Sequence, residues 1–241
     1  MRVVTHVEGG YAEYAIANAP EIAPLPPNVP FEQAVAIPVQ GMTAYLLLDA
    51  AGRLKAGESV LVHAAAGGVG TLAVQIAKLL GAGTVIGTAR TPAKLDLIRE
   101  LGADVALNST SPDWPAQAMA ATGGRGVDVI LDAVGGPVGQ QSLGVLARFG
   151  RLLVYGGLSG QPTMFAAQQL MRNCASVTGF NTPSQRPEDL ARAGQALVGY
   201  LAAGKLRVIV DRTYPLAAAA EAHRALEAGH TTGKVVLTVG E

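Results

Sequence analysis

A cluster of small residues follows a short apolar run and could bind a phosphate. Residues 59–62 read Ser-Val-Leu-Val, which predicts a buried strand, and an apolar helical pattern continues from residue 69 to residue 80. A strand, a glycine turn and a helix aim backbone N–H groups and the positive helix end at a diphosphate. Gly67 would let the backbone approach the phosphates, and Gly70 would let the helix close on the strand. Ala65 replaces the first glycine of the G-x-G-x-x-G pattern, so a purely structural turn stays open.

Two cationic side chains follow the next predicted strand. Residues 83–90 complete a βαβ unit, and position 90 lies twenty residues beyond Gly70 (90 − 70 = 20). An NAD enzyme places an acid near this position to bind the ribose hydroxyls. This chain has Arg90, with Lys94 four residues later. Two cations suit a 2′-phosphate, so the pattern favours NADPH over NADH. The alternative is a solvated helix start at Pro92.

Strands and helices continue to alternate after this unit. We expect four further strands, at residues 104–108, 127–132, 150–155 and 175–181. Parallel strands with helical crossovers give an α/β fold with a doubly wound Rossmann sheet, which binds ligands beyond the carboxyl ends of its strands. Four residues at such ends are candidates for binding: Asp132, Gly135, Gly156 and Asn181. The glycines could instead only turn the chain.

The flanking segments have a different pattern. We expect a β-like segment at 11–16, a stiff proline-rich linker at 24–30 and a short helix at 31–37. From about residue 206 the pattern indicates a strand, a helix over 217–228 and a final strand over 234–239. These pieces look like parts of a smaller β-rich unit. We therefore divide the chain into residues 1–37, 38–205 and 206–241.

Composition narrows the function classes. The 241 residues are 49% hydrophobic and 15% charged, and the formal net charge is zero. The chain has no basic tract, so nucleic acid is not an expected partner. Cys174 is the single cysteine, which excludes an internal disulfide and predicts a reducing compartment. The first residues lack a signal-peptide pattern, and every long apolar run is interrupted, so we expect a cytoplasmic protein that does not enter a membrane.

Four stretches of the chain resemble one known family. They are Pro38-Val39-Gln40-Gly41-Met42-Thr43-Ala44-Tyr45, residues 62–70, Glu100-Leu101-Gly102-Ala103-Asp104 and Thr232-Gly233-Lys234-Val235-Val236-Leu237. These are similar to zinc-independent quinone oxidoreductases of the medium-chain dehydrogenase/reductase superfamily, in one register over nearly the whole chain. The resemblance implies a Rossmann domain joined to a GroES-like catalytic domain. It also implies reduction of quinones or other α,β-unsaturated carbonyls with NADPH. Members carry a longer N-terminal GroES-like portion, so only remnants of that domain are expected here.

The resemblance also implies roles for individual residues. The pyrophosphate would be held by Ala66, Gly67, Gly68 and Val69, and the 2′-phosphate by Arg90 and Lys94. Many members place a ring beside that phosphate, where this chain has Asn108 and Ser109. The riboses and the nicotinamide would be bordered by Gly135, Tyr155, Gly156, Gly157, Phe180 and Asn181. Thr43 and Tyr45 lie where the family's cleft begins, although Tyr45 is at least as compatible with a packed helix aromatic.

Other chemistries lack the residues they need. One cysteine and four scattered histidines cannot form a catalytic or structural zinc site, and His63 reads as a satisfied core residue. Tyr200 and Lys205 are one residue too far apart for a short-chain dehydrogenase motif. Residues 229–234 superficially resemble a P-loop but are one residue short and precede a strand. We identify no catalytic acid or base.

Two other functions stay open. The chain could bind NADPH without catalysis, or it could be an enoyl reductase segment of an assembly that builds acyl chains. The resemblance further implies a homodimer through the edge of the Rossmann sheet, where residues 177–180 would pair with a second copy.

Overall fold

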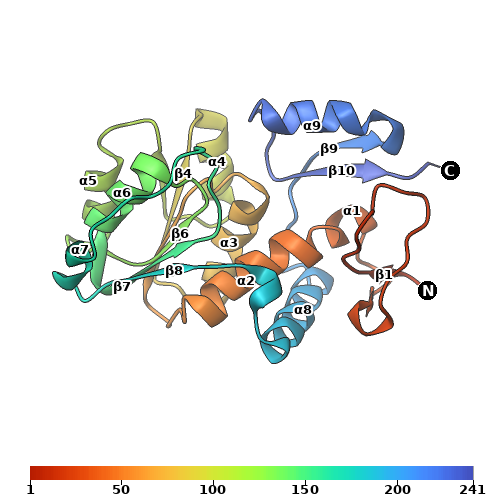
Figure 1. Cartoon of the computed structure of the whole chain (residues 1–241), viewed down its shortest axis with the longest axis horizontal. Coiled ribbons are helices and arrows are strands. Elements are labelled where there is room, and N and C mark those ends of the chain that lie inside the picture. Colours follow the sequence, from red (N-terminus) through yellow and green to blue (C-terminus); the bar gives the residue numbers. More distant parts are fainter. Residues whose placement is uncertain (241) are drawn as a thin grey trace.

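A computed structural model describes residues 1–240, whose main body is a six-stranded parallel sheet (Figure 1). The strands are β3 (Ser59–Val62), β4 (Thr84–Ala89), β5 (Val105–Asn108), β6 (Val127–Asp132), β7 (Leu146–Val154) and β8 (Ser176–Gly179). Their order is β5-β4-β3-β6-β7-β8, so the chain reverses its direction across the sheet between β3 and β6. This is the doubly wound arrangement predicted from the sequence, with its switch point beside β3.

The central strands are buried on both faces, which explains their continuous apolar sequences. Val60 and Val62 pack into one core cluster, and Leu61 packs into the other. The first face is covered by α2 (Met42–Leu46), α3 (Gly68–Leu79), α4 (Pro92–Glu100) and α8 (Pro187–Ala202). The second face is covered by α5 (Trp114–Ala121) and α6 (Gly136–Gly144).

Helix α3 carries the predicted apolar stripe, and its buried surface is wider than predicted. Leu72, Ala73, Ile76 and Ala77 are buried as expected. Val74 is buried as well, because α2 also packs against α3.

Residues 31–51 form a helical stretch that is apolar and long enough to cross a membrane by length and composition alone. It comprises α1 (Phe31–Ala34), the π-helical turns Ile37–Gly41 and Leu47–Ala51, and α2 between them. Leu46, Leu47 and Leu48 have no exposed surface and belong to the core that α3 and α8 share. The apolar character of this stretch is therefore accounted for by packing inside the protein.

Strand β7 begins earlier than predicted, at Leu146 and not at residue 150. The pairing of β6 with β7 shifts register after Val127, and Phe149 has left-handed backbone (φ 62°). Gly150 therefore lies inside an irregular strand. The sequence pattern placed the strand boundary at this glycine because glycines commonly end strands.

The expected β-like segment at residues 11–16 is wrong. This segment has no regular structure, and Tyr14 and Ile16 are more than nine-tenths exposed. β propensity requires a neighbouring strand, and none of the described strands pairs with this segment. The N-terminal pairing is instead short and antiparallel, between β1 (Val3–Val4) and β2 (Ala23–Pro24). The helix expected over 31–37 ends as α1 at Ala34 and gives way to the π-helical turn.

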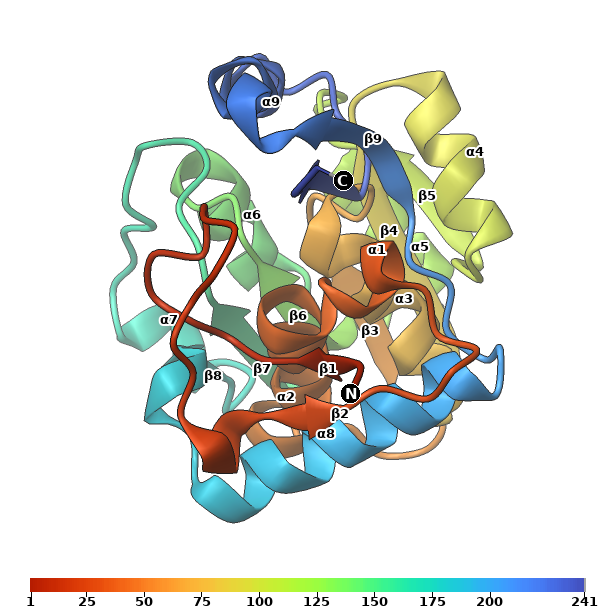
Figure 2. The same ribbon diagram turned by 90° about the vertical axis from the view of Figure 1, so that its right-hand side faces the viewer.

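The C-terminal residues contain the predicted strand, helix and strand. These elements are β9 (Val210–Pro215), α9 (Ala219–Glu227) and β10 (Lys234–Thr238). The two strands pair in parallel in a sheet of their own. Figure 2 shows these elements above the end of the sheet at which α3 begins. The remaining short elements are α7 (Gln168–Met171) and 3-10 turns at Ala19–Glu21, Thr182–Ser184 and Leu216–Ala218.

Candidate cofactor site

The six parallel strands bring most of the candidate residues to one edge of the sheet. Every strand of this sheet runs in the same direction, so their carboxyl ends lie together. The candidates that follow these ends are Ala66 to Gly70, Arg90, Asn108, Ser109, Asp132, Gly135, Tyr155 to Gly157, Phe180 and Asn181. In such sheets this edge is where ligands bind.

The turn between β3 and α3 is tightly built. An ideal Cβ on Gly70 would lie 2.6 Å from the Cα of Ala65, so only glycine fits there. Ala64 has left-handed backbone (φ 50°), which alanine rarely adopts. Gly67 is the N-cap of α3, and its carbonyl accepts the N–H of Thr71 at 2.9 Å. The N–H groups of the first helical residues have no intrahelical acceptor and are available to an anion.

The C-terminal segment 229–234 lies against this turn. The Gly233 N–H donates to the Ala66 carbonyl at 2.8 Å, and Gly233 forms an isolated bridge with Gly67. Lys234 Nζ donates to Gln40 Oε1 at 3.2 Å. Gln40 comes from the π-helical turn before α2. The turn is thus bordered by two segments that are far apart from it and from each other in the sequence.

Arg90 and Lys94 lie at the other end of the same segment. Lys94 Nζ donates to the Gly229 carbonyl at 3.1 Å. Arg90 Nη2 lies 2.8 Å from the position of an ideal Cβ on Gly229. Burial and the neighbouring Arg90 lower the pKa of Lys94, and the carboxylate of Asp211 opposes that shift. An anion placed between the two cations would relieve their mutual repulsion.

Asn108 and Ser109 are close to these cations in the strand order, because β5 pairs with β4. Asn108 Oδ1 accepts the N–H of Thr110 at 3.0 Å and its hydroxyl at 2.8 Å. The Ser109 N–H donates to the Ala89 carbonyl at 2.9 Å. The Asn108 oxygen therefore stabilises its own turn.

Asp132 and Gly135 are placed at the predicted edge, but both are buried. Asp132 Oδ1 accepts the N–H groups of Val134 at 2.7 Å and Gly135 at 3.0 Å. This carboxylate therefore holds the turn after β6 and has no exposed surface. Within residues 1–240, Asp132 Oδ2 and Thr163 Oγ1 are buried without a hydrogen-bond partner. Burial, with a further contribution from Asp132, raises the pKa of Tyr155.

His63 is a core residue, as the sequence predicted. Its ring nitrogens lie 3.1 Å from Thr88 Oγ1 and 2.8 Å from Ser142 Oγ. The ring also meets Trp114 edge to face, with centroids 5.0 Å apart. Burial lowers the pKa of His63 to about 4, against a smaller opposing effect of Asp132. The imidazole is neutral near pH 7.

The carboxyl ends of β7 and β8 form the other half of the edge. Gly156, Gly157 and Asn181 are exposed there, and Tyr155 and Phe180 are half-buried. Thr43 Oγ1 lies 2.9 Å from Thr182 Oγ1, which connects α2 to the segment after Asn181. Tyr45, by contrast, is a packed core aromatic, and its burial raises the pKa of the phenol.

Sequence reasoning assigned no role to Gln40, Thr182, Gly233 or Lys234, all of which border this edge. Gln40, Gly233 and Lys234 stood inside the stretches that carried the family resemblance. The contact of Gly233 and Lys234 with this part of the fold depends on the return of the chain after residue 206, which no local pattern indicates. For these two residues and Gln40, presence in those stretches was the only signal, and Thr182 had none.

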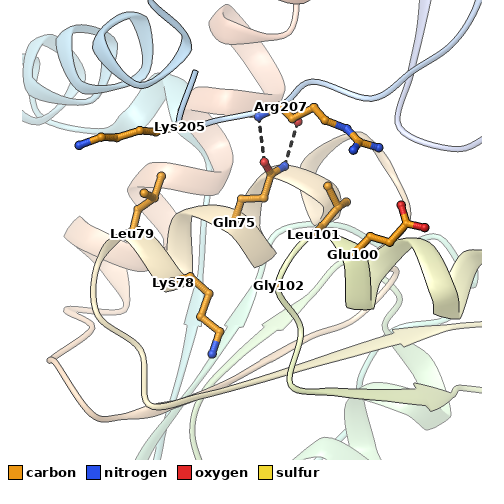
Figure 3. A pocket seen from close by; sticks show the side chains of 8 residues that line it. All are labelled: Gln75, Lys78, Leu79, Glu100, Leu101, Gly102, Lys205 and Arg207. Carbon is orange, nitrogen blue, oxygen red and sulfur yellow. Dashed lines mark hydrogen bonds between the residues drawn. The ribbon is translucent and has the colours of Figure 1, made fainter. Parts of the chain in front are cut away.

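Two surface cavities lie away from the glycine turn. One, of about 340 Å³, lies at the opposite end of α3 and is lined by Gln75, Lys78 and Arg207 among others (Figure 3). The second, of about 420 Å³, adjoins the edge strand β8 and includes Arg53, Arg151 and Gln185. Neither contains the candidate cations Arg90 and Lys94.

Comparison with known proteins identifies the family. The sequence model of the zinc-binding dehydrogenase family matches residues 68–198. The quinone oxidoreductase of Pseudomonas aeruginosa is 34% identical over 95% of this chain and 71% of its own length. The chain belongs to the quinone oxidoreductase family of the medium-chain dehydrogenase/reductase superfamily. Within residues 1–240, no group of three or more His, Cys, Asp or Glu side chains is placed to hold a metal ion.

Two further relatives match almost the whole of this chain. The quinone oxidoreductase of Thermus thermophilus, solved alone and with NADPH, has a TM-score of 0.88 and 37% identity, over 98% of this chain and 76% of its own. A highly reducing polyketide synthase of Aspergillus niger is 33% identical over the whole of this chain. The chain spans 10% of that synthase, and about 70% of the quinone oxidoreductases it matches.

Proposed function

We propose that this chain binds NADPH and reduces a quinone or another α,β-unsaturated carbonyl. The observation that carries the proposal is the position of the glycine turn of α3 beside Arg90, which follows the adjacent strand β4, and Lys94, which lies in the first turn of α4. The glycine turn provides amides for a pyrophosphate, and the two side chains provide cations for a 2′-phosphate. When bound, the cofactor would supply a hydride to the acceptor.

The residues of this chain would bind and orient the cofactor. Ala66 to Gly70 would hold the pyrophosphate, and Arg90 and Lys94 the 2′-phosphate, with Asn108 and Ser109 beside them. Asp132 would act indirectly, by fixing the turn at Gly135 through its two backbone hydrogen bonds. Tyr155, Gly156, Gly157, Phe180, Asn181 and Thr43 would border the nicotinamide half. No acid or base is assigned, and solvent would supply the proton.

The test of this proposal is cofactor oxidation with a simple quinone and with an alkenal. We expect NADPH to be consumed with either acceptor and NADH to be a poorer donor. The absence of any binding of NADPH to folded protein, measured by calorimetry, would refute the proposal. Tight binding without turnover of either acceptor would favour a non-catalytic NADPH-binding protein.

A second candidate is an enoyl reductase segment of an assembly that builds acyl chains. The match to a polyketide synthase along the whole of this chain favours it. The two candidates share cofactor and hydride chemistry and differ in the acceptor. Turnover restricted to enoyl chains attached to a carrier would select the second.

We also propose the organisation and setting of the protein. The family match lies inside residues 38–205, which supports the assignment of these residues to the Rossmann domain. Residues 1–37 and 206–241 would then be parts of a GroES-like domain on either side of it. The outer strand β8 supports a homodimer formed by strand pairing. An exposed thiol at Cys174 supports a reducing location such as the cytoplasm.

A further inference from the structure

Lys234 is a half-buried cation without an anionic partner among the described residues. It opens β10, and its Nζ donates to the neutral amide oxygen of Gln40 at 3.2 Å. Within residues 1–240, no carboxylate lies at salt-bridge distance from it. Burial lowers the pKa of this ammonium. A cation withdrawn from water without a counter-charge is unfavourable unless a ligand supplies one.

Gln40, which Lys234 contacts, and Gly233, which precedes Lys234, both lie against the start of α3. An ideal Cβ on Gly68, the first residue of the helix, would lie 3.0 Å from Gln40 Cγ and 3.4 Å from the Gly233 carbonyl oxygen. Gln40 and the Gly233–Lys234 segment therefore approach the helix start together. Arg90 and Lys94 do not share this position, because they contact Gly229 at the other end of the segment.

The charges at this point favour the binding of an anion. The start of α3 carries the positive end of the helix dipole and free N–H groups, and Lys234 adds a full positive charge. Each phosphate of a pyrophosphate carries a negative charge. Such a group would offset both the helix dipole and the ammonium.

We propose that Lys234, oriented by Gln40, neutralises the pyrophosphate of the bound dinucleotide. This inference rests on the proposed function and adds a binding residue to it. The pyrophosphate is common to NADPH and NADH, so Lys234 contributes equally to the binding of both. Arg90 and Lys94 contribute to NADPH alone.

The experiment measures dissociation constants by calorimetry for three probes: NADPH, NADH and 2′-AMP, which has the 2′-phosphate but no pyrophosphate. Lys234→Met is expected to weaken the binding of NADPH and of NADH by a similar factor, about tenfold or more. The affinity for 2′-AMP is expected to stay unchanged. Lys234→Arg keeps the charge and is expected to retain most of the affinity. Lys205→Met is the matched control, because it removes a lysine from the linker beside the cavity of Figure 3 and is expected to change nothing.

A second readout does not depend on removing the lysine. Gln40→Glu places a carboxylate beside Lys234 and is expected to weaken the binding of both dinucleotides. It also covers the case in which Lys234→Met does not fold. In the wild type, pyrophosphate binding raises the pKa of Lys234, so at alkaline pH binding takes up a proton and its heat depends on the ionisation enthalpy of the buffer.

The outcomes separate this inference from the proposed function. If Lys234→Met and Gln40→Glu fold and bind both dinucleotides as tightly as the wild type, the role of Lys234 is overturned and the proposed function stands. If Lys234→Met weakens the binding of NADPH and not of NADH, the lysine contacts the 2′-phosphate and the inference is overturned. If folded wild-type protein binds neither dinucleotide, both proposals are overturned.

Discussion

Gln75 on α3 holds both backbone groups of Arg207, in the linker between α8 and β9. Gln75 Nε2 donates to the Arg207 carbonyl at 2.9 Å, and its Oε1 accepts the Arg207 N–H at 2.8 Å (Figure 3). The chain after α8 therefore contacts α3 at two places, at Gln75 through Arg207 and at the glycine turn through Gly233.

Gln75→Ala is expected to loosen the linker. Both Arg207 groups would lose their protein partner and bind water, so we expect a loss of about 1 kcal/mol in the free energy of unfolding. Urea titration and amide exchange at Arg207 measure the two effects. Gln75→Glu keeps the acceptor and should preserve the Arg207 amide bond. Unchanged exchange in Gln75→Ala would contradict the role of this side chain.

Gly70→Ala is expected to destabilise the protein and to abolish dinucleotide binding. The added Cβ would lie 2.6 Å from the Cα of Ala65 and force the turn apart, at a cost of about 2–3 kcal/mol. Gly199→Ala is the matched control, because that glycine lies in α8 with open space around it. It should gain about 0.5–1 kcal/mol. Equal melting temperatures of the two variants would show that the turn is not closely packed.

Arg90→Ala and Lys94→Ala are each expected to reduce the preference for NADPH. Removing one cation should lower the affinity for NADPH by about tenfold and leave the affinity for NADH almost unchanged, because only NADPH carries the 2′-phosphate. Calorimetry with both dinucleotides measures the ratio. Arg99→Ala, which removes an exposed cation from α4, the helix that contains Lys94, is the control. Parallel loss of both affinities would place these cations elsewhere on the cofactor.

His63 is expected to make stability depend on pH. Its pKa is about 4 in the folded protein and 6.5 when unperturbed, so between these values the unfolded chain binds more protons. Its contribution to stability is therefore complete above pH 6.5 and is lost as the pH falls toward 4, by on the order of 3 kcal/mol. Denaturant titrations across this range measure how steeply the free energy of unfolding changes with pH. His63→Gln should make this pH dependence weaker, and the control His6→Gln, at an exposed histidine, should not. A pH dependence that His63→Gln leaves unaltered would assign the effect to other groups.

Thr178→Lys is expected to dissociate the proposed dimer. Thr178 is exposed on the edge strand β8, and edge lysines oppose strand pairing between copies. Light scattering should report a dimer for the wild type and a monomer for this variant. Ser184→Lys, an exposed change just beyond β8, is the control. A wild-type monomer would remove the proposal.

The sequence predicted the Rossmann sheet well because each of its strands is specified locally. Strand β6 was predicted at its observed bounds, 127–132, since an apolar run there lies between glycines and polar residues. The failure at residues 11–16 has the opposite cause. Their alternating pattern had no strand to pair with among the described residues, and pairing is not encoded in one segment.

The candidate site was predictable only where one loop contains it. The residues from Ala66 to Gly70 are contiguous, so the glycine motif indicated Gly67 and Gly70, and the family resemblance added the residues beside them. Asp132 was predicted at the correct strand end, but the inward direction of its carboxylate depends on Val134 and Gly135. Lys234 required knowledge of how β10 returns to the glycine turn, which is a long-range contact.

The left-handed backbone at Ala64 has a kinetic consequence. An L-residue in this conformation costs about 1–2 kcal/mol, and the close approach of Gly70 to Ala65 leaves the chain little alternative. The curvature that presents the amides is thus in place before any dinucleotide arrives. Rapid-mixing experiments should therefore record a single association phase, with no slow step in which the loop rearranges around the bound dinucleotide.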